Sequence, residues 1–525
     1  MAAGDKLINV DKMFSVGFIQ DKGMNKTPDE FADDLRNIRI KNWGITQRPW
    51  KEELYNWGTA NAIQWITSNN DRLYVVNNAR LVEVNYTADP ITITDRWALT
   101  WLTSTTKCNF INYGIYTIIL TGIDYPRVWD GTTLTKLTSA NIDVNSNPQF
   151  WTRFAGFTVV NSQVNKNAIL ISNPISLAVQ TNAYDWNGAG ADSITYDGNV
   201  LWVVGTLNNL WIFTSTTIER MDKSNLSTVW DVASLYSIPL AKWQELMNSN
   251  CIVSAGDVIF FLTKNKKIWV INYQSTVAEP SLKIISDIDV NSIDWYMQDQ
   301  IDEDQTGAFG IFDSVNNLAK FFVKSRESTV NDVCIIYDIQ HNTRLKDNNK
   351  FYSYLTMLKN ELYAGSALDY RVYKDEYGAS DAWDGIEWYF ETTDQVYWTP
   401  RQQKQFRGAS IAWQINSLAN IRRQIYVDET LQFDKVVSWE DIAGSVWLLG
   451  IWWKEIWGTP IWWEMYDYQS DLVSFERIID WASLRASGKK VKMIFSDDSV
   501  WWNFVLDFLS LVIRPRVREN IQDKM

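Results

Sequence analysis

The sequence contains very few of the residues that most often perform catalysis or hold metals. Its 525 residues include one histidine and three cysteines. Histidine-dependent triads would all need His341, which stands in a polar, turn-like run where we expect a solvated loop residue. Zinc sites with two or three histidines are excluded. Cys108, Cys251 and Cys334 are isolated, so they form no CxxC pair and no disulfide framework, and a reducing compartment fits best.

Basic residues and long apolar runs are also scarce. Acidic residues outnumber basic ones by 62 to 49, for a net charge of −13, which argues against a basic groove for nucleic acid. The N-terminus has no apolar segment typical of a signal peptide. The stretch Phe504–Ile513 is interrupted by Asp507 and is too short to span a bilayer. We therefore expect an unsecreted protein without a membrane segment.

One acidic run partly matches a calcium-binding loop. Asp302, Asp304, Thr306, Gly307 and Asp313 fall at positions 1, 3, 5, 6 and 12 of the EF-hand pattern. Thr replaces Asp or Asn at position 5, Asp replaces the bidentate Glu at position 12, and the flanks resemble strands. Whether Asp302, Asp304 and Asp313 bind an ion or form an acidic β-turn stays open.

Neighbouring carboxylates offer a second kind of candidate. Glycosidases need two carboxyl groups on opposite sides of a bond. The pairs Asp33-Asp34 and Asp497-Asp498 do not establish that geometry, and we interpret them as solvated turns. No HExxH, Walker A or GxGxxG motif is present. The sequence therefore assigns no catalytic, cofactor-binding or metal-binding residue and predicts a protein that is not an enzyme.

A repeated β unit organises most of the chain. A short apolar strand, a polar turn and a second strand recur, as in Leu73–Val76 followed by Leu81–Val84, and Val258–Leu262 followed by Ile268–Ile271. Counted from Arg72, successive units start 42, 41, 44, 58, 50 and 54 residues apart. Four-stranded propeller blades need about 40 to 50 residues each. β-Sandwiches would need boundaries about every 100 residues, and a solenoid would need shorter, stricter periods.

These patterns predict an all-β chain with three parts. Residues 1–50 form an N-terminal arm, with a brief helix from Thr27 to about Leu35 and a strand over Arg36–Ile40. Residues 51–375 form a β-propeller of about seven blades, uncertain by one or two. Residues 376–525 form a C-terminal β-sandwich, because three downstream segments alternate in β fashion before the final strand Leu511–Arg514 and a charged tail.

Short motifs then resemble one protein family. The segment Asp34–Arg39 leading to Gly44–Pro49 resembles the opening of tail proteins of tailed bacteriophages, of the hub, nozzle or DNA-stabilisation type. Gly122–Gly131 and Arg401–Gly408 are similar to later segments of such proteins, and so is Ile171–Pro174, which Tyr184–Gly188 follows. The resemblance covers most of the chain.

The resemblance implies a structural role in the virion. Such subunits form rings, typically hexamers, below the portal and adaptor, and they line or close the DNA exit channel until ejection. It implies contacts with the portal, the adaptor and other tail proteins, and assembly in the host cytoplasm. DNA would pass without sequence-specific binding, and an acidic wall that repels phosphate would let it slide.

Two other functions remain as alternatives. A carbohydrate-binding propeller, lectin-like or receptor-binding, predicts exposed aromatic residues repeated once per blade. A glycan-cleaving tailspike enzyme predicts two converging carboxylates in a cleft. Tryptophan spacing argues against the lectin, because six tryptophans crowd into 17 residues outside the propeller.

The tryptophan and glycine counts are themselves abnormal. The chain has 29 tryptophans and 24 glycines, whereas glycine usage near 7% would give roughly 37. The excess gathers where turns favour glycine, and reading glycine at Trp50 completes the opening motif. We therefore hypothesise that many tryptophans are glycines in the native protein, through a genome that reads UGA as glycine. The positions concerned include Trp50, Trp398, Trp452, Trp453, Trp462 and Trp463. The alternative is a protein that is truly rich in tryptophan, with indole pairs filling an interface core.

Overall fold

The computed structural model describes the chain in segments. They are residues 6–9, 32–41, 44–49, 51–56, 62–69, 71–86, 92–99, 102–103, 107–143, 146–176, 178–188, 191–222, 236–239, 246–248, 250–272, 281–285, 294–341, 343–376, 388–392, 404–415, 421–437, 478–479, 486–488, 491–497 and 504–515.

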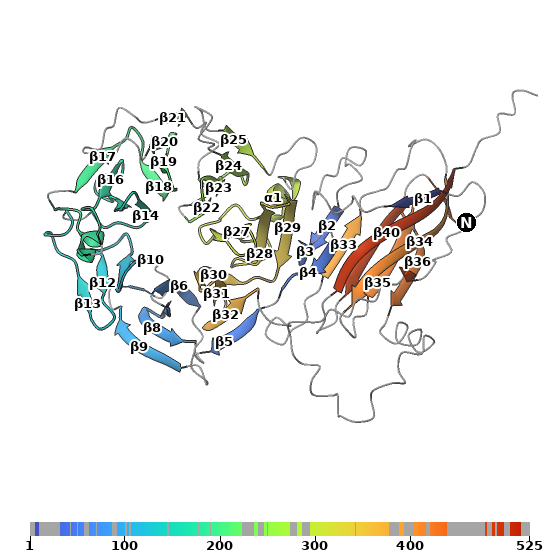
Figure 1. Cartoon of the computed structure of the whole chain (residues 1–525), viewed down its shortest axis with the longest axis horizontal. Helices are drawn as coiled ribbons and strands as arrows, with labels where there is room; N and C mark the ends of the chain where they lie inside the picture. Colours follow the sequence, from blue (N-terminus) through green and yellow to red (C-terminus); the bar gives the residue numbers. More distant parts are fainter. Residues whose placement is uncertain are drawn as a thin grey trace, which may run out of the picture.

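Seven four-stranded antiparallel sheets follow one another and form a seven-bladed β-propeller, seen as the ring in Figure 1. This confirms the fold class expected from the repeat. Each of the seven repeat starts falls in a different blade. Five lie at the second strand of a blade, and those near Asn199 and Gly307 lie at the first.

The blades, numbered in chain order, have these bounds. Blade 1 contains β6 (Ile63–Asn69), β7 (Arg72–Asn77), β8 (Arg80–Asn85) and β9 (Thr92–Ala98). Blade 2 contains β10 (Asn109–Tyr113), β11 (Tyr116–Leu120), β12 (Arg127–Trp129) and β13 (Leu134–Lys136). Blade 3 contains β14 (Trp151–Phe154), β15 (Phe157–Asn161), β16 (Ala168–Ile171) and β17 (Asp192–Thr195), with the 3-10 helix η2 (Gln180–Tyr184) before β17. Blade 4 contains β18 (Val200–Gly205), β19 (Asn209–Thr214), β20 (Thr217–Asp222) and β21 (Tyr236–Pro239).

Among the later blades, a helix follows blade 5, and blade 7 closes the ring by pairing with a strand from the beginning of the propeller. Blade 5 contains β22 (Ile252–Ala255), β23 (Val258–Leu262), β24 (Ile268–Asn272) and β25 (Ser281–Ile284), and the helix α1 (Asp294–Gln300) follows it. Blade 6 contains β26 (Phe309–Asp313), β27 (Leu318–Val323), β28 (Val333–Asp338) and β29 (Thr343–Asn348). Blade 7 contains β30 (Tyr352–Leu358), β31 (Glu361–Ser366), β32 (Arg371–Asp375) and, as its outermost strand, β5 (Glu52–Asn56) from the beginning of the propeller.

Tight hairpins explain how short sequence units become blades. The expected hairpins are confirmed: β7 pairs with β8, and β23 pairs with β24. Asn78 and Ala79, between β7 and β8, both have positive φ, as a primed two-residue turn requires, and Lys359 and Asn360 repeat this between β30 and β31. Such turns match the twist of the strands they join.

The first strand of each blade faces the propeller axis. First strands of neighbouring blades contact one another, including β14 with β18, β22 with β26, and β30 with β6. Aromatic rings pack between these first strands. Trp65 of β6 stacks on Tyr354 of β30 with ring centroids 3.5 Å apart, and the ring centroids of Phe309 of β26 and Tyr354 are 5.1 Å apart. We call the face on which these first strands begin the start face.

The arm and the chain after the propeller form two more sheets, on the right of Figure 1. One contains β1 (Lys6–Asn9), β3 (Ile38–Lys41), β4 (Gly44–Gln47), β34 (Lys404–Ile415), β37 (Ile478–Ile479), β38 (Ala486–Gly488) and β40 (Phe504–Pro515). The other contains β2 (Ala32–Arg36), β33 (Trp388–Thr392), β35 (Ile421–Val427), β36 (Thr430–Val437) and β39 (Val491–Asp497). Both sheets of this C-terminal sandwich therefore include strands from the arm.

One local expectation was wrong. The helix predicted to run to about Leu35 is replaced, over Ala32–Arg36, by β2, which pairs with β33; residues 27–31 lie outside the described residues. Pairing with a distant strand overrides a capping signal that contributes only about 1 kcal/mol. The strand expected over Arg36–Ile40 is interrupted at Asn37, whose φ of 56° separates β2 from β3.

Candidate functional site

The arm is joined to blade 6 through Asn37. This residue is 3% exposed, its backbone N–H donates to the Lys346 carbonyl at 2.9 Å, and its side-chain oxygen accepts from the Asn348 N–H at 3.0 Å. Arg48 Nε donates to the same oxygen at 3.0 Å. The positive φ of Asn37, tolerated by asparagine more than by most residues, turns the chain toward the outer edge of β29. The arm thus covers an edge strand that would otherwise be open.

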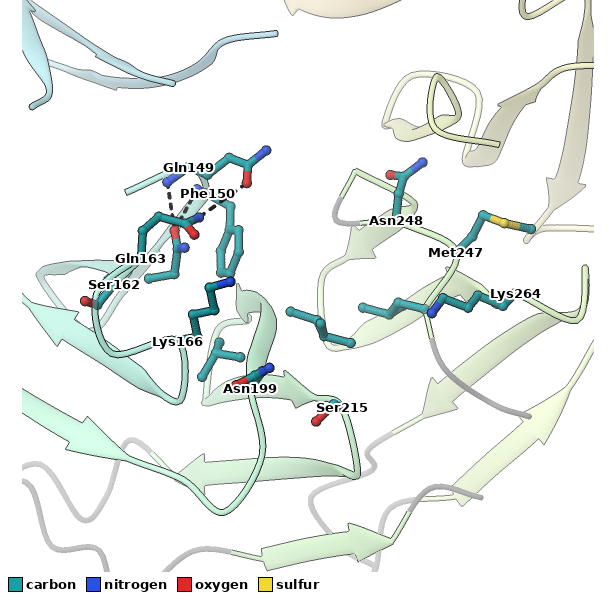
Figure 2. A pocket seen from close by; sticks show the side chains of 14 residues that line it. Gln149, Phe150, Ser162, Gln163, Lys166, Asn199, Ser215, Met247, Asn248 and Lys264 are labelled. Atoms are coloured by element: carbon teal, nitrogen blue, oxygen red, sulfur yellow. Dashed lines mark hydrogen bonds between the residues drawn. The ribbon is translucent and has the colours of Figure 1, made fainter. Parts of the chain in front are cut away.

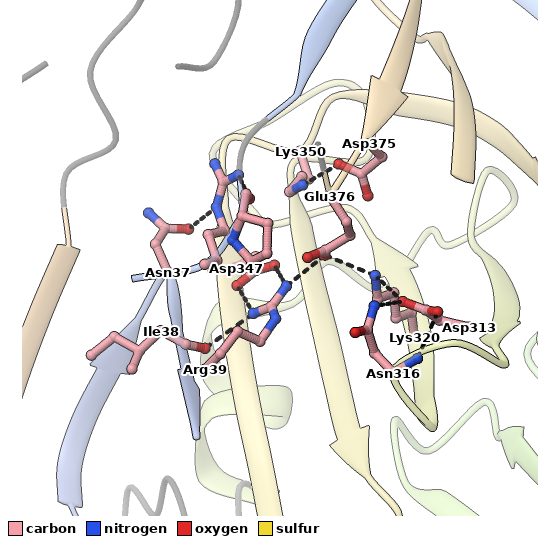
Figure 3. Close-up of polar contacts among 12 residues, drawn as sticks. Asn37, Ile38, Arg39, Asp313, Asn316, Lys320, Asp347, Lys350, Asp375 and Glu376 are labelled. Carbon is pink, nitrogen blue, oxygen red and sulfur yellow. Dashed lines mark hydrogen bonds and ion pairs between the residues drawn. The ribbon is translucent and has the colours of Figure 1, made fainter. Parts of the chain in front are cut away.

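A buried ionic cluster extends this joint (Figure 3). Arg39 of β3 donates to both carboxylate oxygens of Asp347, at 2.8 and 2.7 Å, and to Glu376 Oε1 at 2.7 Å. Asp347 belongs to β29 of blade 6, and Glu376 directly follows β32 of blade 7. One guanidinium therefore connects the arm to two blades, and its contact with Asp347 is bidentate, the strongest arrangement for an ion pair.

Lys320 continues the cluster into blade 6. Its ammonium group lies 2.8 Å from Glu376 Oε1 and 3.0 Å from Asp313 Oδ2, and its side chain is fully buried. Nearby, Lys350 pairs with Asp375, whose Oδ1 also accepts from the Tyr352 hydroxyl at 2.7 Å. We call these seven charged residues the joint cluster; they are Arg39, Lys320, Lys350, Asp313, Asp347, Asp375 and Glu376.

Apolar packing encloses the joint cluster. Ile38 of the arm and Ile425 and Val427 of β35 belong to the same buried core as Tyr352 and Leu355 of blade 7. Arm, sandwich and propeller therefore share one apolar core around a set of paired charges. Burial makes these charges costly unless all remain paired, so the joint favours one arrangement of the three parts.

Sequence patterns did not single out this cluster. Arg39 is 308 residues from Asp347 and 337 from Glu376, so no local spacing connects them. The one available signal is Lys320, a lysine inside the apolar strand Leu318–Val323. A charge in such a run is rarely buried without a partner.

The joint cluster predicts a specific dependence of stability on pH. Burial alone would raise the pKa of Glu376, but Arg39, Lys320 and Lys350 outweigh it and hold that pKa well below its ordinary value of 4.5. The carboxylate therefore stabilises the fold above about pH 4.5, and this contribution is lost as the pH falls through the folded pKa. Burial opposes the charge of Lys320, but Glu376, Asp313 and Asp375 raise its pKa above 10.5. Its contribution is therefore lost as the pH rises through that higher value.

Urea unfolding at several pH values tests this expectation. Below about pH 4.5, wild type should lose stability more steeply than Glu376→Gln, which has no proton to take up at this site. A matched control is Glu303→Gln, which changes a carboxylate outside the joint cluster. Identical slopes for wild type and Glu376→Gln would contradict the expected role of Glu376.

A polar cleft opens on the start face between blades 3, 4 and 5 (Figure 2). It has a volume of about 410 Å³. Its walls come from the starts of β14, β18 and β22 and from the hairpins after β15, β19 and β23. The lining residues are Gln149, Phe150, Asn161, Ser162, Gln163, Lys166, Asn199, Val200, Leu201, Ser215, Leu246, Met247, Asn248 and Lys264. Seven carry amides or hydroxyls, two are lysines and none is acidic.

A lysine bridges the propeller axis on the same face. Lys107, just before β10, donates to the Thr306 carbonyl of the segment before β26 at 3.1 Å, and so connects blades 2 and 6. Its side chain is exposed to solvent, but the surrounding protein displaces water and lowers the pKa of the ammonium group. The axis is therefore crossed by a side chain at this end.

The residues of the calcium-like run lie in two different places. Asp302 and Asp304 accept backbone N–H bonds from Asp304 and Thr306, at 2.9 and 3.2 Å, and Lys324 lies 3.3 and 3.5 Å from their carboxylates. Asp313 is at the other end of β26, in the joint cluster. No group of three or more potential metal ligands occurs within the described residues.

His341 lies in the turn between β28 and β29, which agrees with the expected loop position, but its side chain is half-buried. Its Nδ1 is 2.7 Å from Asp338 Oδ2, and its side chain is 22% exposed. The three cysteines are buried and unpaired by disulfides. Burial raises the pKa of the Cys108 and Cys251 thiols to about 12, which keeps them protonated. The turns expected at the neighbouring carboxylates are wrong for three of the four residues, because Asp33 and Asp34 lie in β2 and Asp497 ends β39, and both strands pair with β33. Asp498 is outside the described residues.

Five of the tryptophans described in the propeller are core residues. Trp65, Trp129, Trp186, Trp211 and Trp269 are each at most 6% exposed. Within the described segments, Trp97 is the one aromatic among the exposed large apolar side chains, at 44%. No tryptophan there has positive φ. The positions proposed as recoded, Trp50, Trp398, Trp452, Trp453, Trp462 and Trp463, lie outside the described residues.

Comparisons with known proteins concern the fold. No protein-family model matches the chain, and no curated protein matches it. Among solved structures, the chain is similar to YCF48 bound to a D1 peptide, with 10% identity and a TM-score of 0.39, covering 64% of this chain and 97% of that one. YCF48 from Cyanidioschyzon merolae gives 9% identity, a TM-score of 0.38, and coverage of 62% and 98%.

A longer protein is similar over part of its length. PorZ, a bacterial surface component of the type-IX secretion system of Porphyromonas gingivalis, gives 11% identity and a TM-score of 0.39. The match covers 74% of this chain but only 46% of PorZ. Within the described residues, no helix is long and apolar enough to cross a membrane.

Proposed function

We propose that the chain is a virion structural protein of tailed bacteriophages, a subunit of the tail hub or nozzle type. In this proposal, copies assemble into a ring, with a hexamer favoured. The ring lines or closes the DNA exit channel and stabilises the packaged genome. It contacts the portal, the adaptor and other tail proteins, and it is assembled in the host cytoplasm before becoming part of the virion tail.

The joint cluster is the observation that carries this proposal. Arg39 and Asn37 fix the arm to blades 6 and 7, and the arm's strands complete both sheets of the sandwich. A subunit that resists the pressure of packaged DNA needs its parts held in one arrangement, which buried paired charges favour. The combination of arm, propeller and C-terminal sandwich is also what the resemblance of the sequence motifs implies.

The net charge and the contact that crosses the propeller axis support a DNA channel enclosed by several subunits. The net charge of −13 favours a ring whose lumen is acidic and repels phosphate, so that DNA would slide without sequence-specific binding. The propeller axis itself is crossed by the bond from Lys107 to Thr306. The proposed channel is therefore the lumen enclosed by several copies.

Native mass spectrometry and negative-stain electron microscopy of the purified full-length protein test the proposal. We expect closed rings, with six copies favoured, that become more populated as protein concentration rises. In parallel, fluorescence anisotropy with two unrelated DNA duplexes should show equally weak binding to both. Monomers at every concentration, alone and after mixing with portal and adaptor proteins, would overturn the proposal, as would tight binding to one duplex only.

A further inference from the structure

The cleft on the start face presents polar side chains that the protein itself does not use. Lys166 and Asn199 are exposed and Ser215 is half-buried, and all three line the cleft. Within the described part of the chain, none of these three side chains has a hydrogen-bond or ion-pair partner. A lysine, an amide and a hydroxyl therefore remain available to a ligand.

Backbone hydrogen bonds bring together the chain segments that carry these three side chains. The Val200 N–H donates to the Lys166 carbonyl at 2.7 Å, and the Ser215 N–H donates to the Asn199 carbonyl at 2.9 Å. The hairpin that carries Lys166, the start of β18 and the hairpin after β19 are thereby linked across blades 3 and 4. In Figure 2, Lys166 and Asn199 project from this linked wall, and Asn248, Met247 and Lys264 lie on the opposite side.

The upper part of the cleft is also fixed before any ligand binds. Asn161 Oδ1 accepts from the backbone N–H groups of Gln149 and Phe150, at 2.8 and 3.0 Å. Gln163 Nε2 donates weakly to Gln149 Oε1, at 3.4 Å. A ligand would therefore meet a largely pre-formed wall of amides, which lowers the entropic cost of binding.

The composition of the lining indicates the class of ligand. Lys166 supplies a positive charge and no acidic residue lines the cleft, in a chain whose acidic residues outnumber basic ones by 62 to 49, so a negative ligand group is favoured. Amides and hydroxyls can each donate and accept, as pairs of sugar hydroxyls require. Leu201 and Met247, which are half-buried, add apolar contacts for the C–H face of a ring. A volume of about 410 Å³ suits one or two sugar units.

We propose that this cleft binds a carboxylated saccharide of one or two units. Lys166 pairs with the carboxylate, while Asn199 and Ser215 bond the neighbouring hydroxyls. This site does not depend on a ring of subunits, so it can be present or absent independently of the proposed tail function. It also differs from an aromatic lectin platform, because its specificity comes from polar groups and one charge.

Isothermal titration calorimetry with the full-length protein tests the site. The probes are digalacturonate, the neutral disaccharide lactose, inorganic phosphate and a short oligoglutamate. We expect digalacturonate to bind most tightly, and Lys166→Met to weaken it by about tenfold or more, as expected for the loss of one charge-assisted hydrogen bond. Asn199→Ala should weaken digalacturonate and lactose to a similar degree, because it removes a contact to hydroxyls.

A matched control separates the site from general charge effects. Lys359→Met removes the same charge from the opposite face, between β30 and β31, where the lysine is 52% exposed, and it should leave binding unchanged. Unchanged thermal melting of Lys166→Met would show that the variant is folded. The proposal fails if no binding of digalacturonate is detected at ligand concentrations up to about 10 mM, which would reveal even very weak affinity. It also fails if Lys359→Met weakens binding as much as Lys166→Met, or if phosphate or oligoglutamate binds more tightly than digalacturonate.

Discussion

Replacing Arg39 with methionine should destabilise the protein by about 3 to 5 kcal/mol. Methionine preserves much of the apolar stem but leaves Asp347, whose side chain is 1% exposed, without its bidentate partner. Glu376 loses one of the two cations that contact it directly and keeps Lys320. The cost arises mainly from carboxylates left buried without full pairing, since the intact pair itself contributes little net stability.

Urea denaturation combined with hydrogen exchange measures this effect. Amide exchange at Asn348, whose N–H donates to Asn37, should accelerate in Arg39→Met, because the arm loses its attachment to blade 6. Arg422→Met is the matched control, since Arg422 pairs with Asp434 at the surface, with side-chain exposures of 53% and 30%. That exposed pair should cost at most about 1 kcal/mol. Equal costs for the two variants would contradict the role given to the joint.

A double variant isolates the ion pair from the loss of packing. Combining Arg39→Met with Asp347→Asn removes the uncompensated charge, so the pair of substitutions should cost less than the sum of the single ones. Arg39→Lys should fall between wild type and methionine, because lysine keeps the charge but cannot make the bidentate contact.

The propeller could be predicted from sequence because its information is local. Each blade is made of hairpins, and hairpins such as β7–β8 are specified by alternating apolar residues and a short turn such as Asn78-Ala79. The seven repeat starts gave the correct number of blades. Closure by β5 was not predicted, because pairing of Tyr55 with Val372 depends on the ring as a whole.

The arm and the candidate sites were harder to predict from the sequence, because their contacts join segments that lie far apart in the chain. β1 and β4 pair with β40, more than 450 residues later in the chain, and nothing in their short sequences specifies that partner. Capping residues at Thr27–Glu30 instead indicated a helix. In the cleft, Lys166, Asn199 and Ser215 stand in ordinary connections between strands, and backbone bonds within blade 4 and between blades 3 and 4 bring these connections together.

If the crowded tryptophans are glycines in the native protein, we expect a large effect on its stability and solubility. The described tryptophans are consistent with genuine indoles: Trp129 and Trp211 are almost fully buried, and none there has positive φ. Such positions should remain tryptophan in the native protein. The suspected glycines are different, because they crowd into turn-like sequence such as Gly458-Thr-Pro460 with its neighbours Trp457 and Trp462.

Peptide mass spectrometry of the protein from its native source tests recoding directly. We expect glycine at Trp50, Trp398, Trp452, Trp453, Trp462 and Trp463, and tryptophan at Trp129 and Trp211. If 15 of the 29 tryptophans are glycines, glycine rises to 39 of 525 residues, about 7.4%, close to average usage. Tryptophan at all six positions, or UGG codons there, would refute the hypothesis.

Two synthetic genes extend the test to folding. One encodes tryptophan at the six positions and the other glycine, and both are expressed as full-length protein. Where the backbone is left-handed, a side chain costs about 1 to 2 kcal/mol per residue, so the glycine version should be more stable and more soluble. The matched control replaces Trp129 and Trp211 with glycine, which should destabilise the propeller by at least about 3 kcal/mol for each buried indole removed. If the glycine version is instead the less stable of the two, the crowded tryptophans are real core or interface residues.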